Sequence, residues 1–133
     1  AMPTAWRGFD ATGIMAACMT QDMAIMAIRI FAASYLASSV RTGRESILTS
    51  NTEPDSEERM AKTLFGQIGD SYGNRAQTAL RFALSNQNVS TAIIGLAEPR
   101  HLEKAVDGAA MGALPQSALE KIETLYGTGF GAA

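Results

Sequence analysis

The sequence is poor in the residues that mark several common kinds of site. Its 133 residues include one cysteine (Cys18), one histidine (His101) and one tryptophan. A single cysteine excludes an intrachain disulfide and a cysteine-based zinc cluster, and it favours a reducing compartment, which we take to be the cytoplasm. Because Cys18 lies in the run IMAACM, we expect it to be a buried small hydrophobic residue rather than a nucleophile.

Charge of one sign and long apolar runs are also scarce. The net charge is -2 and the basic residues are scattered, so we do not expect a nucleic-acid surface. The longest apolar stretch, 23–36, is interrupted by Arg29 and is too short to span a bilayer. A cationic start followed by an apolar segment is missing as well, so no signal peptide is expected. We therefore expect neither nucleic acid nor a membrane as partner.

The composition supports one folded unit. Hydrophobic residues make up 47% of the chain and charged residues 18%, which is enough for a packed core. We divide the sequence into a tail at 1–8, a domain at 9–127 and a flexible, glycine-rich tail at 128–133.

The apolar pattern predicts an alternation of strands and helices. The unbroken apolar run 23–31 fits a parallel strand buried on both faces, with a buried helix as the competing interpretation, and 90–94 is the second strand. Helices are predicted at 9–20 with Asp10 as the cap, from Asp55 or Ser56 to Gly73, at 74–86 with Asn74 as the cap, at 99–110 with Pro99 first, and from Pro115 onward. This order indicates an α/β fold with a parallel sheet.

The predicted core faces of the last two helices are apolar. The side chains expected to point inward are Leu102, Val106, Leu119, Ile122 and Leu125.

Two parallel strands cannot form a stable sheet alone, because both edges stay open. The sequence therefore resembles part of a larger sheet protein. We expect Ile25, Ile28, Ile93 and Ile94, or their neighbours, to be exposed. Large apolar patches drive association, so a homo-oligomer formed through the sheet edges is expected.

The stretch RAQTALRFALSNQNVSTAIIGLAEPRHLEKAV resembles the C-terminal part of an aldo/keto reductase. Enzymes of that family are TIM barrels that bind a nicotinamide cofactor. The earlier run IMAIRIFAASYL resembles the seventh strand of the barrel and the loop after it, and NRAQTALRFALSN with TAIIGLAE is similar to the branch of galactose and fucose dehydrogenases. The resemblance covers about residues 9–127. It implies a helix-rich partial TIM barrel containing strands seven and eight.

The catalytic tetrad of the family, Asp, Tyr, Lys and His, comes from the first half of the barrel. Its motifs have no counterpart here. The tyrosines Tyr35, Tyr72 and Tyr126 lie in other segments, and His101 falls on the helix that meets the cofactor. The resemblance therefore implies a chain without hydride-transfer activity of its own.

Part of the cofactor site is implied to survive after the first strand. The segment 29–36 matches the loop that lies along the pyrophosphate of NAD or NADP, with Arg29, Ser34 and Leu36 as candidate contacts. Ser34 stands where the family pattern has glycine. Arg29 could meet a phosphate, and it could equally pair with a carboxylate at a strand end.

The corner at 95–101 is implied to receive the adenosine half of the cofactor. Gly95 permits a close approach of the backbone, and the helix start at Pro99 is expected to offer amides to an anion. The implied cofactor contacts are Gly95, Leu96, Ala97, Glu98, Arg100 and His101. Glu98 could accept a hydrogen bond from a ribose hydroxyl, which favours NAD. Arg100, a cation, acts against that preference. His101 has the alternative of being a solvated helix residue.

Three functions remain open at this point. The chain can be a fragment of an NAD(P)-dependent aldo/keto reductase that is inactive alone. It can be a self-associating structural module without a cofactor. It can also be a weak nucleotide binder that complements a separate N-terminal half-barrel.

Overall fold

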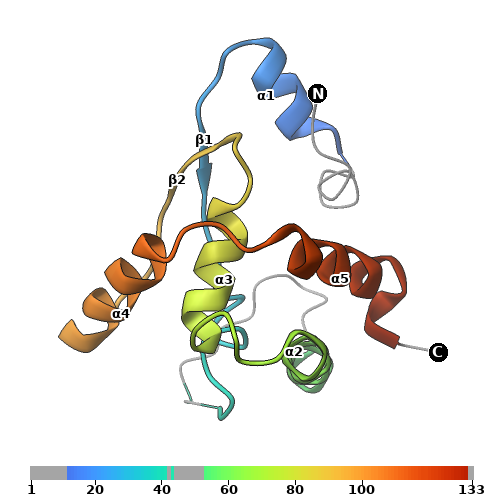
Figure 1. Cartoon of the computed structure of the whole chain (residues 1–133), viewed down its shortest axis with the longest axis vertical. Coiled ribbons are helices and arrows are strands. Elements are labelled where there is room, and N and C mark those ends of the chain that lie inside the picture. Colours follow the sequence, from blue (N-terminus) through green and yellow to red (C-terminus); the bar gives the residue numbers. More distant parts are fainter. Residues whose placement is uncertain (1–11, 42, 44–52, 132–133) are drawn as a thin grey trace.

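The computed structural model describes residues 12–41, 43 and 53–131 (Figure 1). In this part of the chain the elements are α1 (Ile14–Thr20), β1 (Ile25–Ala27), α2 (Pro54–Ile68), α3 (Arg75–Leu84), β2 (Val89–Ala92), α4 (Pro99–Ala110), α5 (Gln116–Gly127) and the short 3-10 helix η2 (Gly129–Gly131). No helix within the described ranges has the length and apolar character needed to cross a bilayer. Residues 9–11 of the predicted helix 9–20, including its cap Asp10, lie outside the described residues. The described helix starts later than predicted, at Ile14, after Gly13 as the N-cap.

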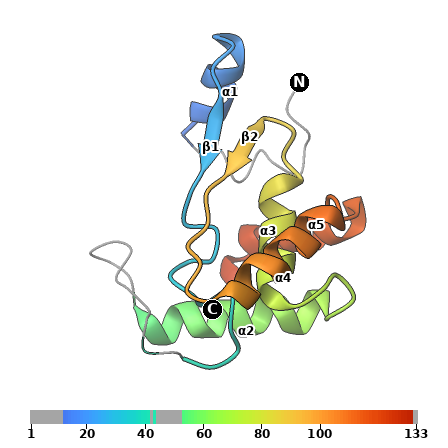
Figure 2. The same ribbon diagram turned by 90° about the vertical axis from the view of Figure 1, so that its left-hand side faces the viewer.

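The two strands pair in parallel, as predicted. Ile25 lies opposite Val89 and Ala27 opposite Ala92, with a register irregularity after Ile25. Figures 1 and 2 show the strands side by side, with α1 at one end of the molecule and α2 at the other. The chain is therefore a helix-rich α/β unit built around a two-stranded sheet.

The prediction of a long strand at 23–31, buried on both faces, is wrong. Only Ile25–Ala27 is extended, and Met26 is 65% exposed. Parallel strands are buried when helices cover both faces of the sheet. In the described part of the chain β1 has β2 as its one neighbouring strand, and the face that carries Met26 is exposed. The second strand was expected at 90–94 and lies at Val89–Ala92.

The backbone after β1 turns sharply and ends the strand early. Four residues adopt left-handed φ angles: Arg29 (57°), Ala32 (44°), Ala33 (54°) and Ser34 (81°). Each such non-glycine residue costs roughly 1–2 kcal/mol. The turn is closed by hydrogen bonds, such as the one that the Leu36 amide donates to the Phe31 carbonyl at 3.1 Å. This strained segment is the one that sequence analysis assigned to the cofactor.

The caps of the middle helices differ in how well the sequence predicts them. α2 starts after Glu53, with Pro54 in its first turn, so the predicted caps Asp55 and Ser56 are wrong. α2 also stops earlier than Gly73, because Gly69 takes a left-handed φ of 73°. At α3 the Asn74 cap is confirmed.

α3 begins with a reciprocal capping box. The Gln77 amide donates to Asn74 Oδ1 at 2.9 Å, and the Asn74 amide donates to Gln77 Oε1 at 3.0 Å. This arrangement satisfies two amides that a helix start would otherwise leave without partners.

The hydrophobic core lies among the helices and not beneath the sheet. Ile68 of α2 packs with Leu114 and with Ala118, Leu119 and Ile122 of α5. Leu119 and Ile122 are buried as predicted, and Leu125 is half-buried. The core thus joins α2, α3 and α5 into one layer below the strands.

Two other burial predictions are wrong. Leu102 and Val106 of α4 are 54% and 60% exposed, because α4 packs on α3 through a neighbouring face that carries Ala105 and Gly108. Cys18 is only half-buried, since α1 has no buried residue in the described part of the chain.

A buried arginine ties the helical layer together. Arg81 of α3 is 8% exposed, and its guanidinium donates to the carbonyls of Tyr72, Gly112 and Ala113 at 2.8, 2.8 and 3.0 Å. Ser85, one turn later, accepts a hydrogen bond from the Leu114 amide at 2.8 Å. One face of α3 therefore holds both the α2–α3 turn and the α4–α5 turn.

Arg81→Met removes these three donors and leaves buried carbonyls unpaired. We expect the free energy of unfolding in urea to fall by about 3 kcal/mol, with Arg81→Lys intermediate because an ammonium cannot span the same three acceptors. Lys121→Met, an exposed cation on α5, is the control and should change stability by less than about 0.5 kcal/mol. A loss below about 1 kcal/mol for Arg81→Met would contradict the clamp.

Candidate functional site

The largest described cleft lies where three segments meet: the turn after β1, the start of α3 and the corner between β2 and α4. Its volume is about 610 Å³, a size typical of small-molecule sites. Its walls are formed by Phe31, Ser34, Ala37, Ser38, Asn74, Ala76, Gln77, Leu80, Gly95, Leu96, Ala97, Glu98, Arg100, His101, Lys104 and Ala105.

Seven of the nine residues predicted as cofactor contacts line this one cleft. They are Ser34, Gly95, Leu96, Ala97, Glu98, Arg100 and His101. Leu36 faces a different, apolar pocket of about 330 Å³ against α2 and α5. Arg29 is exposed and does not line the cleft. Segments about 60 residues apart in the sequence thus meet at one surface.

The charged groups of the corner are paired with each other. Arg100 Nε lies 2.6 Å from Glu98 Oε2, so each side chain neutralises the other. Lys104, one turn further along α4, adds a cation to the wall. Two cations and one carboxylate leave this side of the cleft with a net positive charge when His101 is neutral.

The start of α4 offers fewer amides than expected. Pro99 occupies the first helical position, as predicted, and it has no N–H. The His101 amide donates to the Glu98 carbonyl at 2.9 Å. Two of the first three amides are therefore not available to an anion. The half-buried His101 side chain lines the cleft, which favours the binding interpretation over the solvated one.

Gly95 is not required by the fold of the chain itself. Its φ lies outside the left-handed region, and a Cβ placed there would meet no protein atom within 4 Å. The open space next to Gly95 would allow a ligand to approach the backbone closely.

Sequence reasoning missed the contribution of α3 to the cleft. Asn74 and Gln77 line it together with Lys104. The signal was present, since Asn followed three positions later by Gln is a capping-box pattern. Only the three-dimensional packing, however, places that helix start against the 95–101 corner.

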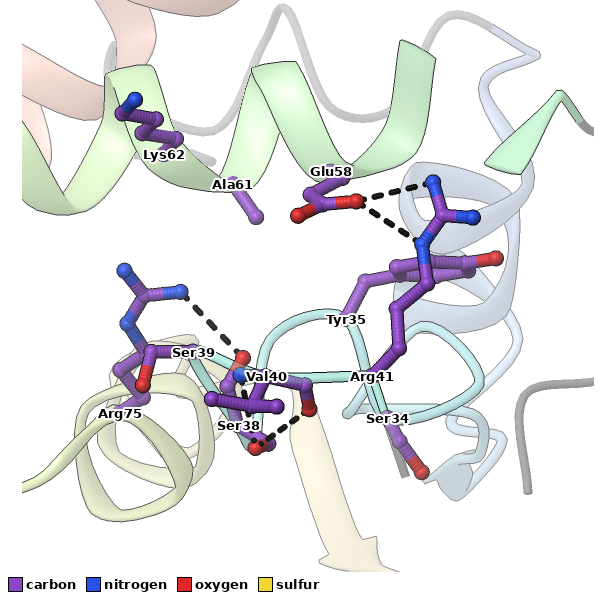
Figure 3. A pocket seen from close by; sticks show the side chains of 10 residues that line it. All are labelled: Ser34, Tyr35, Ser38, Ser39, Val40, Arg41, Glu58, Ala61, Lys62 and Arg75. Atoms are coloured by element: carbon purple, nitrogen blue, oxygen red, sulfur yellow. Dashed lines mark hydrogen bonds and ion pairs between the residues drawn. The ribbon is translucent and has the colours of Figure 1, made fainter. Parts of the chain in front are cut away.

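A second, smaller pocket adjoins the cleft and shares Ser34 and Ser38 with it. Figure 3 shows its walls, with Glu58 and Lys62 coming from α2 and Arg75 from α3. Its volume is about 240 Å³. Arg75 donates to the Ser38 carbonyl at 3.3 Å and stacks on Phe65 with its Cζ 4.6 Å from the ring centre, so it holds the turn after β1 against the helices.

Arg41 closes the rim of this pocket through two carboxylates. It bonds to Glu58 at 2.9 Å and also to Asp55 (Figure 3 shows the Glu58 contact). The hydrogen bond with Asp55 is the main cause that raises the pKa of Arg41, and the same bond lowers the pKa of the Asp55 carboxyl. These ion pairs anchor the end of the turn to α2.

The cleft brings together the hydroxyls of Ser34 and Ser38, the imidazole of His101 and the ion pair of Glu98 with Arg100. Among the described residues no group of three His, Cys, Asp or Glu side chains could hold a metal ion. A nucleotide fits the donor set, because hydroxyls and cations suit phosphates and Glu98 suits a ribose hydroxyl.

The comparison with family models assigns the class. The model described as the aldo/keto reductase family matches residues 3–126, which is nearly the whole sequence. The chain therefore belongs to the aldo/keto reductase family, a family of oxidoreductases. No curated protein and no solved structure gives a significant match.

Ser34→Gly should stabilise the protein. Ser34 holds a φ of 81°, a conformation that favours glycine. We expect the free energy of unfolding to rise by about 0.5–1 kcal/mol, after allowing for the greater freedom of glycine in the unfolded chain. Ser39→Gly, in the same segment but without a positive φ, should lower it. Equal effects of the two substitutions on the melting temperature would contradict the strain at Ser34.

Proposed function

We propose that this chain is the C-terminal portion of an NAD(P)-dependent aldo/keto reductase and that the cleft binds the adenosine half of the cofactor. The observation that carries the proposal is the convergence of Ser34 with the corner 95–101 on one cleft of ligand size. The family match supports the same class of ligand, because these enzymes use nicotinamide cofactors.

Each wall has a binding task in this proposal. Gly95, Ala97 and His101 would hold the adenosine half, the glycine by permitting a close approach and His101 by offering its ring to the base. The Ser34 hydroxyl and the Lys104 ammonium would meet the phosphates, where charge-assisted hydrogen bonds are strong. The chain's own contribution is thus to hold and orient the cofactor, which supplies the hydride chemistry when bound.

We do not expect the chain to turn over substrate alone, because the tetrad motifs of the family have no counterpart in its sequence. A separate N-terminal half-barrel that brings those residues would complete the enzyme. The motifs TAIIGLAE and NRAQTALRFALSN favour a sugar dehydrogenase as the complete protein, acting in the cytoplasm.

The ion pair at the corner bears on the choice between NAD and NADP. Glu98 repels the 2′-phosphate of NADP, and Arg100 attracts it, but each is engaged with the other at 2.6 Å. A 2′-phosphate would have to compete with Glu98 for the guanidinium. We therefore expect a modest preference for NAD.

Isothermal calorimetry with ADP-ribose, NAD and NADP tests this assignment. We expect the wild-type chain to bind all three nucleotides. Glu98→Ala should raise the affinity for NADP about tenfold, because it releases Arg100 to the 2′-phosphate. The same substitution should lower the affinity for NAD, because a contact to a ribose hydroxyl is lost. Glu103→Ala is the matched control, since Glu103 is an exposed carboxylate of α4 outside the cleft lining. Absence of binding by all three nucleotides would refute the proposed function.

Self-association is the second candidate, and the exposed sheet favours it. Ile28 and Ile93 are 62% and 51% exposed, whereas Ile25 and Ile94 are half-buried. Within the described residues the sheet has two strands, so each strand has one edge without a strand neighbour. Leu102 and Val106 add an exposed apolar stripe on α4. We propose that a second copy covers the sheet when no N-terminal half-barrel is present.

Light scattering of the wild-type chain should then give the mass of a dimer or a larger oligomer. The Ile28→Lys, Ile93→Lys double variant should be a monomer, because burying two ammonium groups in the interface is too costly in free energy. Val40→Lys, at a residue 71% exposed beyond the sheet, is the control and should leave the mass unchanged. A monomeric wild-type chain at micromolar concentration would rule out this candidate.

A further inference from the structure

One buried side chain of the cleft wall, Gln77, bonds to two helices at once. Its carboxamide oxygen accepts the Asn74 amide at 3.0 Å, and its carboxamide nitrogen donates to the Lys104 carbonyl of α4 at 3.2 Å. The residue is 9% exposed. Both halves of the amide are therefore used, one to cap α3 and the other to hold α4.

The same side chain sets how closely the two helices approach. Gly108 of α4 faces it, and a Cβ at Gly108 would lie 3.0 Å from Gln77 Cγ, 3.2 Å from its Cβ and 3.3 Å from its Cα. Such distances are shorter than ordinary van der Waals contact, so the helices meet this closely only because residue 108 lacks a side chain. The bond to Lys104 and the contact at Gly108 lie one turn apart on α4.

α4 carries Glu98, Arg100 and His101 at its start, so its position on α3 sets the width of the cleft. We propose that Gln77 is the positioning residue of the site: by fixing α4 against α3 it places the 95–101 corner at the distance that a nucleotide needs. The ligand named here rests on the proposed function, whereas the mechanical role of Gln77 does not.

Gln77→Glu separates the two tasks of the side chain. The carboxylate still accepts the Asn74 amide, so the cap of α3 is kept, and Glu is a normal residue at this capping-box position. The donor to the Lys104 carbonyl is lost, and a negative charge faces that carbonyl instead. We expect amide hydrogen exchange at residues 103–108 to accelerate about tenfold, while exchange in α5 is unchanged.

Gly108→Ala provides a second variant that keeps every hydrogen-bonding group of Gln77 and of the α4 backbone and replaces glycine with a better helix former. It should perturb the amide chemical shifts of both α4 and the 95–101 corner, because the added methyl pushes α4 away from Gln77. Ile122→Val, in the core between α2 and α5, is the control for general loss of stability. It should raise exchange in all protected helices without favouring α4.

Nucleotide titrations separate this proposal from the proposed function. With ADP-ribose as the probe, Gln77→Glu and Gly108→Ala should each weaken binding about threefold to tenfold, and Ile122→Val should not. If both cleft variants show the exchange rates and chemical shifts of the wild-type chain in α4 and at the corner, the positioning role is overturned even when ADP-ribose binds. If α4 responds as described and the wild-type chain binds no nucleotide, the positioning role stands and the proposed function fails.

Discussion

The hydrogen bonds of the guanidinium of Arg81 to three backbone carbonyls are the interaction on which the rest of the structure depends. They join the turn before α3 to the turn between α4 and α5, and these turns carry the core helices on one side and α4 on the other. A buried cation normally has a carboxylate partner, and here carbonyl dipoles take that place. Because α3 also carries Gln77 on the same face, one turn before Arg81, one helix organises both the core and the cleft.

The two main segments of the cleft differ in backbone conformation. The corner 95–101 follows a strand and starts a regular helix, whereas four residues of the segment 29–34 have unfavourable left-handed φ angles. Strain of this kind persists where the surroundings impose it, and it gathers at functional sites. Arg75 donates to the carbonyl of Ser38, four residues after the strained Ser34, and so ties the chain that leaves this segment to α3.

The sequence predicts the parts of this structure that depend on local chemistry. Asn74 and Pro99 mark their helices because caps and proline positions follow from the backbone groups of the helix itself. The parallel pairing of the strands follows from the alternation of elements. The prediction that Leu102 and Val106 point inward is wrong, because periodicity identifies an apolar helix face but not whether another element covers that face. The burial of Arg81 and Gln77 could not be predicted, because a polar residue in a sequence is expected to lie at the surface. The cofactor contacts came from the family resemblance, and the structure gathers most of them without testing the ligand.

The central claim is that the cleft between α3 and the 95–101 corner is a nucleotide site. Backbone amide chemical shifts, followed by NMR while ADP-ribose is added, test it most directly. The account predicts saturable changes at residues 34–38, 74–77 and 95–104, with α5 unaffected. Changes absent throughout, or confined to the apolar pocket between α2 and α5, would contradict it.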